Sequence, residues 1–229
     1  MLKSAILSLM LFVLSGCASA QTTTTTVDPG GRMTLTVRDK SVLLAAPHGG
    51  FDLSTDEIVP PVAQKLNYSE LVATGYRAYS HPINVNRPTE GIGLSSEEEK
   101  HTDDAAKVYA EWEADVMKVN PALYVEIHGE GKTSNIEVAV VGFTQEQKTA
   151  IKKILSAALA PLYFKTNPEI KVEGLDSIHF TASAAKKYGV LGKVHRALHI
   201  ELPWDLRRNE KENTTAFLIK ALPEIARLR

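Results

Sequence analysis

Histidines and carboxylates accompany three apolar runs of the sequence, and these are the side chains best suited to chemistry. His48 and Asp52 follow the first run, His128 ends the second, and His199 and Glu201 lie inside the third. Imidazole nitrogens and carboxylate oxygens are common zinc ligands, and a catalytic zinc usually has three protein ligands. Either histidine alone would be interpreted as a turn or strand-end residue. Taken together, the three runs favour a metal site.

Two carboxylates compete for the third ligand position beside His48 and His128. Asp52 and Asp56 both follow His48 closely in the chain, and either could supply the third ligand. Glycine follows each histidine directly, which lets the backbone turn sharply and leaves space for a substrate. The predicted ligand set is therefore His48, His128 and either Asp52 or Asp56.

Glu201 is the candidate general base. Residues two apart in a strand share a face, so His199 and Glu201 are expected to point the same way. A carboxylate inside an apolar strand is costly unless it is paired or used, and beside a metal-bound water it could accept a proton. The same parity places Glu126, His128 and Glu130 on one face. Glu126 either orients a metal ligand or is a solvated residue of an edge strand.

Arg87 is the candidate for substrate recognition, together with its neighbour Asn86. The planar guanidinium suits a substrate carboxylate or an oxyanion that develops on a carbonyl. Arg207 and Arg208, just after the Glu201 strand, compete for this task. The acidic run 97–99 is interpreted as a solvated helix start. Three other histidines have no ligand-like context: His101, His179 and His195.

The elements that must position these residues alternate between strand-like and helix-like patterns. Strands are expected at 33–38, 42–46, 122–128, 136–141, 171–173 and 197–202. Helices are expected at 56–66, 95–119, 144–159, 181–188 and 210–228. This alternation predicts an α/β fold, a single three-layer domain with a mostly parallel mixed sheet flanked by helices. Ligands of such sheets bind beyond the carboxyl ends of the strands, where the candidate ligands and base are expected.

The first 32 residues have a different composition from the rest. Residues 1–17 combine one lysine, a short apolar run and a Leu-Ser-Gly-Cys ending, which resembles a bacterial lipoprotein signal with Cys17 as the lipidated residue. The alternative is an ordinary signal cleaved near 18–20. Residues 18–32 are polar and predict a flexible tether, so the folded α/β domain would span 33–229. These features predict a lipid-anchored protein of the bacterial cell envelope.

Net charge argues against a nucleic-acid-binding protein, and cysteine content argues against a disulfide-stabilised one. The net charge is −1 with balanced signs, so nucleic acid is not an expected partner. Cys17 is the only cysteine, which excludes an intrachain disulfide.

Four short motifs, in this order and spacing, resemble the N-formylglutamate amidohydrolase family: Pro47-His48-Gly49-Gly50, Asn86-Arg87-Pro88, Ile127-His128-Gly129 and Ile200-Glu201-Leu202. They are also similar to zinc carboxypeptidases and, at the first motif, to phage poly-γ-glutamate hydrolases. The resemblance covers roughly residues 42–208. Carboxypeptidases place a glutamate three residues after the first histidine, whereas this chain has Phe51 there. Asp52 or Asp56 must therefore substitute, and Asp52 is favoured.

The resemblance implies a zinc-exopeptidase-like fold, with Zn²⁺ bound by two histidines and a carboxylate, Glu201 as base and Arg87 on the substrate. It therefore implies a zinc-dependent hydrolase of an amide bond (peptide, N-acyl or γ-glutamyl) near a substrate carboxylate, acting on a small molecule or peptide. The alternative from another class is a non-catalytic surface binding lipoprotein on the same fold.

Overall fold

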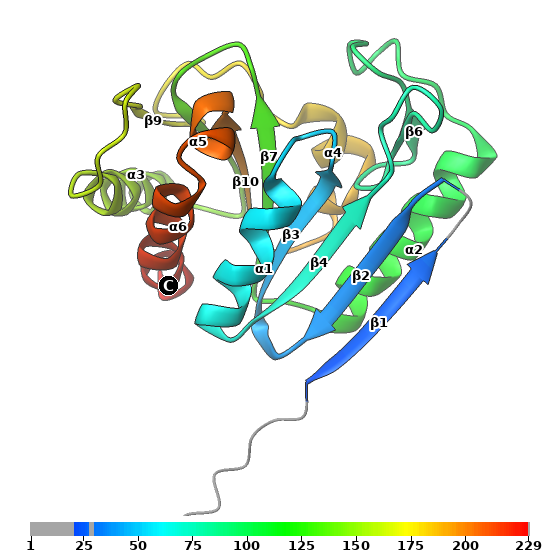
Figure 1. Cartoon of the computed structure of the whole chain (residues 1–229), viewed down its shortest axis with the longest axis horizontal. Helices are drawn as coiled ribbons and strands as arrows, with labels where there is room; N and C mark the ends of the chain where they lie inside the picture. The colour runs from blue at the N-terminus through cyan, green and yellow to red at the C-terminus, as the bar shows by residue number, and fades with distance from the viewer. Residues whose placement is uncertain (1–20, 28–29, 229) are drawn as a thin grey trace, which may run out of the picture.

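The computed structural model describes residues 21–27 and 30–228, and it is built on an eight-stranded sheet with helices on both faces (Figure 1). The sheet order is β1-β2-β4-β3-β7-β10-β8-β9. Its strands are β1 (Thr22–Val27), β2 (Arg32–Val37), β3 (Asp39–Gly49), β4 (Tyr68–Thr74), β7 (Leu123–Glu130), β8 (Ile136–Val141), β9 (Ile170–Val172) and β10 (Ala197–Pro203). A separate pair consists of β5 (Ile83–Asn84) and β6 (Thr89–Glu90).

The centre of the sheet is parallel, as the continuous apolar runs predicted. β3 lies between β4 and β7 and runs parallel to both, and β7 is parallel to β10. The register places Glu201 of β10 beside His128 of β7. The carboxyl ends of β3, β7 and β10 therefore meet at one edge of the sheet. The predicted α/β class with a mostly parallel mixed sheet is confirmed.

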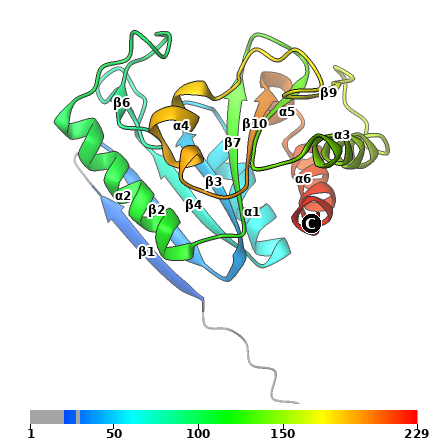
Figure 2. The same ribbon diagram turned by 180° about the vertical axis from the view of Figure 1, so that it is seen from behind.

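Two apolar cores cover the two faces of the sheet. The helices are α1 (Thr55–Leu66), α2 (Asp103–Val119), α3 (Gln145–Leu159), α4 (Ser183–Tyr188), α5 (Trp204–Arg208), α6 (Lys211–Ala226) and the short 3₁₀ helix η1 (Val190–Gly192). α1, α3 and α6 pack on one face, seen in Figure 1. α2 and α4 pack on the opposite face, seen from behind in Figure 2. This is the expected three-layer arrangement.

The predicted tether 18–32 is partly wrong, because residues 22–27 form strand β1 at the edge of the sheet. β1 pairs antiparallel with β2, and threonine hydroxyls contact each other across the pair. Threonine is β-branched and favours strands, so a run of threonines can extend a sheet despite its polarity. Strand β2 is consequently not at the edge. The predicted signal and Cys17 lie outside the described residues.

The helix predicted from residue 95 begins at Asp103 instead. The Thr102 side chain caps it by accepting a hydrogen bond from the Ala105 amide at 3.2 Å. Glu99 turns inward and is buried, so the acidic run 97–99 is not a solvated helix start. Across residues 21–27 and 30–228, the model contains no helix with both the length and the apolar character needed to cross a membrane.

Candidate metal centre

His48 and His128 come from the carboxyl ends of the neighbouring strands β3 and β7, and both are buried. The glycines that follow them are required by close packing. A Cβ at Gly49 would lie 2.6 Å from the Asp56 side chain, and one at Gly129 would lie 2.2 Å from the Arg207 guanidinium. The sequence thus places small residues where the two histidine-bearing strand ends are most crowded.

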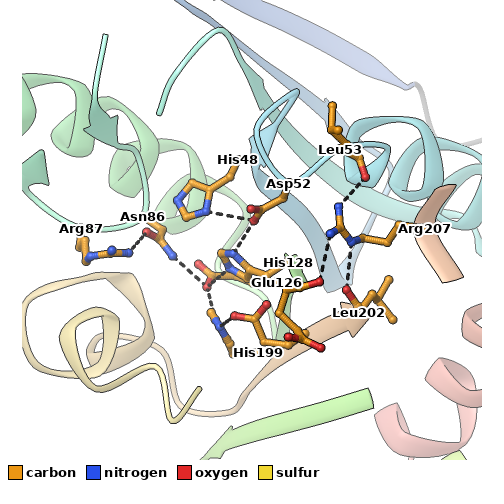
Figure 3. A network of polar contacts seen from close by, with 12 residues as sticks. His48, Asp52, Leu53, Asn86, Arg87, Glu126, His128, His199, Leu202 and Arg207 are labelled. Carbon is orange, nitrogen blue, oxygen red and sulfur yellow. Dashed lines mark hydrogen bonds and ion pairs between the residues drawn. The ribbon is translucent and has the colours of Figure 1, made fainter. Parts of the chain in front are cut away.

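Asp52 lies between the two histidines (Figure 3). Its Oδ2 is 3.2 Å from Nδ1 of His48 and 3.2 Å from Nδ1 of His128. A turn creates this arrangement: the Asp52 amide donates to the His48 carbonyl at 2.8 Å, and Gly50 adopts φ +88°. All three side chains are buried, and their ligand atoms lie within 4.8 Å of one another. Asp56, the alternative ligand, stands at the start of α1 and does not join this group.

A second group with the same residue types shares His128. It consists of Glu126, His128 and His199, and its ligand atoms also lie within 4.8 Å of one another. Oε2 of Glu126 is 3.1 Å from Nε2 of His128 and 3.1 Å from Nδ1 of His199. Glu126 also accepts a hydrogen bond from Asn86 at 3.1 Å and one from the Tyr124 hydroxyl at 2.9 Å. Glu126 is fully buried, so of its two predicted alternatives the structure favours a residue that orients His128.

Ring orientation separates the two groups. His48 and His128 meet edge to face, at 68° with centroids 4.8 Å apart, and both Nδ1 atoms approach the same Asp52 oxygen. Their in-plane lone pairs can therefore converge on one ion. His128 and His199 are stacked, at 27° with centroids 4.0 Å apart. Lone pairs in two nearly parallel ring planes run side by side, so this second group suits hydrogen bonding better than metal binding.

The electrostatics fit a cation between His48 and His128. Burial lowers the pKa of His48 to about 3, so this imidazole is neutral at pH 7, as a metal ligand must be. Burial would also lower the pKa of His128, but hydrogen bonds with Asp52 and Glu126 outweigh it and raise that pKa to about 9, so a metal ion bound by this imidazole would displace a proton. Burial would raise the pKa of Asp52, yet its contacts to His128 and His48 hold that pKa well below its usual range.

Glu201 and His199 point into the same cavity, as their spacing in the strand predicted. Nε2 of His199 is 2.9 Å from Oε1 of Glu201, and both side chains are buried. His199 therefore contacts a carboxylate with each ring nitrogen, Glu201 on one side and Glu126 on the other. This places the candidate base one hydrogen-bonded residue away from Glu126, which in turn contacts His128.

Arg87 is already paired within the protein. Its guanidinium donates to both carboxylate oxygens of Glu99, at 2.8 and 2.5 Å, and to Oδ1 of Asn86 at 3.1 Å. Arg87 lines the cavity, but Asn86 is fully buried and does not. Asn86, predicted to bind substrate, instead joins Arg87 to Glu126 inside the protein. The sequence could not reveal this, because the partners Glu99 and Glu126 lie far apart in the chain.

Arg77 is a cavity residue that the sequence analysis missed. Its Nε is buried and has no hydrogen-bond partner among residues 21–27 and 30–228, and its guanidinium lies 5.1 Å from the centroid of the Phe51 ring. Burial lowers the pKa of Arg77, as does the nearby charge of Arg87. Its position three residues after β4 was the available signal, since β4 runs parallel to the His48 strand and ends at the same edge.

Arg207 and Arg208, the competing candidates for substrate binding, do not line the cavity. The Arg207 guanidinium donates to three backbone carbonyls: Leu202 at 2.9 Å, Leu53 at 2.7 Å and Glu130 at 3.3 Å. It therefore ties together the ends of β10 and β7 and the segment after β3 (Figure 3). The Arg208 guanidinium lies 5.6 Å from the Trp204 ring centroid. Neither arginine lines the cavity described next.

A cavity of about 550 Å³ opens above the strand ends. Its walls bring together the side chains that could bind a metal, accept a proton and hold an anion: His48, Asp52, His128, Glu201, Arg77 and Arg87. His179 and Phe180 line it as well. Sites of this kind, concave and placed beyond the carboxyl ends of parallel strands, are typical of α/β enzymes.

Comparison of the sequence with known families gave no match to a family model and no match among curated proteins. Comparison of the structure did find similar folds. A bacteriophage poly-gamma-glutamate hydrolase superposes with a TM-score of 0.57 at 16% identity, covering 87% of this chain and 91% of that one. A gene product of Agrobacterium tumefaciens matches with a TM-score of 0.50 at 11% identity, covering 82% and 91%.

A metallo-carboxypeptidase from Burkholderia cenocepacia matches with a TM-score of 0.49 at 13% identity. The match covers 92% of this chain and 65% of the carboxypeptidase. At these identities the similarity shows a shared fold.

Proposed function

We propose that the protein is a zinc-dependent hydrolase of an amide bond that lies near a substrate carboxylate. The observation that carries the proposal is the shared carboxylate oxygen of Asp52, 3.2 Å from Nδ1 of His48 and of His128, in a cavity that also presents Glu201. Peptide, N-acyl and γ-glutamyl bonds all fall within this class. The name of the phage neighbour, a poly-gamma-glutamate hydrolase, and the resemblance to N-formylglutamate amidohydrolases support the choice of bond.

The donor set fits zinc. His48, Asp52 and His128 would hold the ion through two imidazole nitrogens and one carboxylate oxygen, a set that suits zinc better than magnesium or calcium. Bound in this way, zinc would lower the pKa of a coordinated water to about 7 and polarise the scissile carbonyl. Glu126 would hold the His128 ring in the required orientation through its contact with Nε2.

The protein's own side chains account for proton transfer and substrate binding. Glu201 accepts the proton of the attacking water, and His199 holds the carboxylate of Glu201 at 2.9 Å. Arg77 supplies the positive charge for the substrate carboxylate, because Glu99 already neutralises Arg87. Arg87 and its paired Glu99 then border the substrate carboxylate and shape its pocket.

Metal analysis combined with a hydrolysis assay tests this proposal. The purified protein is expected to contain one zinc per chain and to hydrolyse members of a panel of N-acyl amino acids and short γ-glutamyl peptides. Glu201→Gln should retain zinc and lose turnover, since glutamine cannot accept the proton. Glu98→Gln, in an exposed turn, is the matched control. Full turnover in Glu201→Gln would refute the mechanism, and absence of both zinc and turnover would favour the non-catalytic binding lipoprotein.

The proposal extends to location, with Cys17 lipidated and the domain held at the bacterial cell envelope. The Leu-Ser-Gly-Cys ending and the single cysteine support it. A Cys17→Ser precursor should remain unacylated and leave the membrane fraction, as followed by labelling with a fatty-acid analogue. Acylation of that variant would contradict the assignment.

A further inference from the structure

His179 lies in the segment between β9 and α4, and the proposed mechanism does not use it. The sequence around it gives no sign of a role. In the structure, however, His179 lines the same cavity as Glu201 and His128. Its side chain is 59% exposed, so a molecule in the cavity can reach it.

A buried carboxylate fixes this segment. Glu137 in β8 has a side chain only 2% exposed, and its carboxylate accepts hydrogen bonds from the His179 amide at 2.7 Å and the Phe180 amide at 3.2 Å. The same carboxylate contacts Nδ1 of His179 at 2.8 Å. A buried carboxylate is unfavourable without such partners. All of its hydrogen-bond partners among the described residues come from two consecutive residues, so Glu137 determines where the imidazole lies.

The register of the sheet places this pair beside the candidate base. Glu137 is the Cα partner of Glu201 where β8 runs antiparallel to β10. Neighbouring strands are about 4.8 Å apart, so the two carboxylates stand on adjacent strands at the same edge. His179, held by Glu137 of the strand next to Glu201, therefore borders the cavity on that side.

The contact with Glu137 occupies only one of the two ring nitrogens of His179. Nδ1 is engaged by the carboxylate, so Nε2 is the nitrogen left to face a ligand. A carboxylate behind an imidazole fixes the orientation of the ring, and histidine is the side chain most often used for proton transfer in catalysis.

We propose that His179, oriented by Glu137, is a second catalytic residue that protonates the leaving amine. The inference rests on the proposed amide hydrolysis. Water oxygen bonds to the carbonyl carbon while Glu201 takes one water proton. As the C–N bond breaks, its electron pair stays on nitrogen, which takes the Nε2 proton of His179. The proton on Glu201 then returns to His179 through solvent, so water and amide give one acid and one amine.

The test compares two leaving groups in a His179→Gln variant. One substrate is the N-acyl amino acid that the wild type hydrolyses fastest, and the other is its thioester analogue, in which sulfur replaces the amide nitrogen. A thiol has a pKa of about 8.5 and leaves as the thiolate without help, whereas an amine requires a proton. We expect the kcat for the amide to fall about 10²- to 10⁴-fold, the usual range for general acid catalysis. The kcat for the thioester should change far less.

Two further variants complete the test. Imidazole added to His179→Ala should restore part of the amide turnover, which a merely structural histidine would not allow. His101→Gln is the matched control, because His101 is exposed and does not line the cavity. An equal loss for both leaving groups, or no loss, would overturn the role of His179 alone. If the wild type cleaves neither substrate class, the proposed function fails and this inference fails with it.

Discussion

The two buried groups that share His128 have nearly the same composition but different chemistry. One contains His48, Asp52 and His128, and the other contains Glu126, His128 and His199. Contacts in both are 3.1 to 3.2 Å long, and every member is buried. The difference is ring orientation: the first pair of imidazoles meets at 68°, and the second pair is stacked at 27°.

This comparison shows that residue types and distances do not define a metal site on their own. In the first group the carboxylate lies where the in-plane lone pairs of two rings converge. In the second group Glu126 also accepts hydrogen bonds from Asn86 and Tyr124, so its oxygens are already engaged. We therefore propose that the first group binds the metal and that the second orients His128 and Glu201.

Asp52→Asn should have the largest effect, because it removes the only carboxylate of the first group. We expect zinc affinity to fall by more than the 10- to 100-fold that is typical for loss of an orienting partner. Competition with a chromophoric chelator measures this affinity. Asp56→Asn, four residues on, is the matched control and should bind zinc as the wild type does. Equal affinities for the two variants would break the distinction between these aspartates.

Glu126→Gln tests the second group directly. Glutamine keeps the size of the side chain but removes the charge behind His128, so we expect a loss of zinc affinity of about 10- to 100-fold. The wild type and the variant should both bind one zinc per chain at saturation, as measured by metal analysis. A wild-type stoichiometry of two that drops to one in the variant would show that the second group binds an ion.

His199→Phe separates the effect of ring stacking on His128 from the effect of the hydrogen bonds of His199. Phenylalanine can still stack on His128 but cannot contact Glu126 or Glu201. We expect zinc affinity to fall less than about tenfold, below the range for a residue that contacts a ligand nitrogen directly. The kcat should fall more strongly, because Glu201 loses the partner that holds it. A zinc affinity as low as that of Glu126→Gln would contradict the proposed division of roles.

Tyr124→Phe should have the smallest effect on the site. It removes one hydrogen bond to Glu126 and leaves the buried Trp112 indole without its 3.2 Å partner. One such bond contributes about 1 kcal/mol net, so zinc affinity should change by roughly a factor of five or less. The free energy of unfolding should fall by about 1 to 3 kcal/mol, as measured by urea titration. An effect on zinc as large as that of Glu126→Gln would contradict the expected order.

The sequence alone predicted the parts of the site that depend on local pattern. Continuous apolar runs predicted the parallel strands β3, β7 and β10, and strand parity predicted that His199 and Glu201 share a face. Because parallel strands end at one edge, the meeting of His48, His128 and Glu201 followed from the fold class.

What the sequence could not provide depends on tertiary partners. Asp52 was favoured over Asp56, but the physical reason is the turn at Gly50, whose φ of +88° brings Asp52 back toward His128 of β7. Arg87 is neutralised by an ion pair with Glu99. The sequence did not reveal this pair, because the acidic run 97–99 was interpreted as a solvated helix start. The importance of His179 depends on Glu137, which lies 42 positions away in the chain.

The contacts of Arg207 have a consequence for the order of folding. Its guanidinium holds the Leu53 carbonyl, 154 positions away and next to Asp52, and the Glu130 carbonyl, 77 positions away. Contacts between such distant positions form slowly, because a long loop must close before they contribute. We therefore expect the segment that carries Asp52 to become fixed only after α5, which follows β10, has docked. For the same reason we expect the cavity to form late in folding.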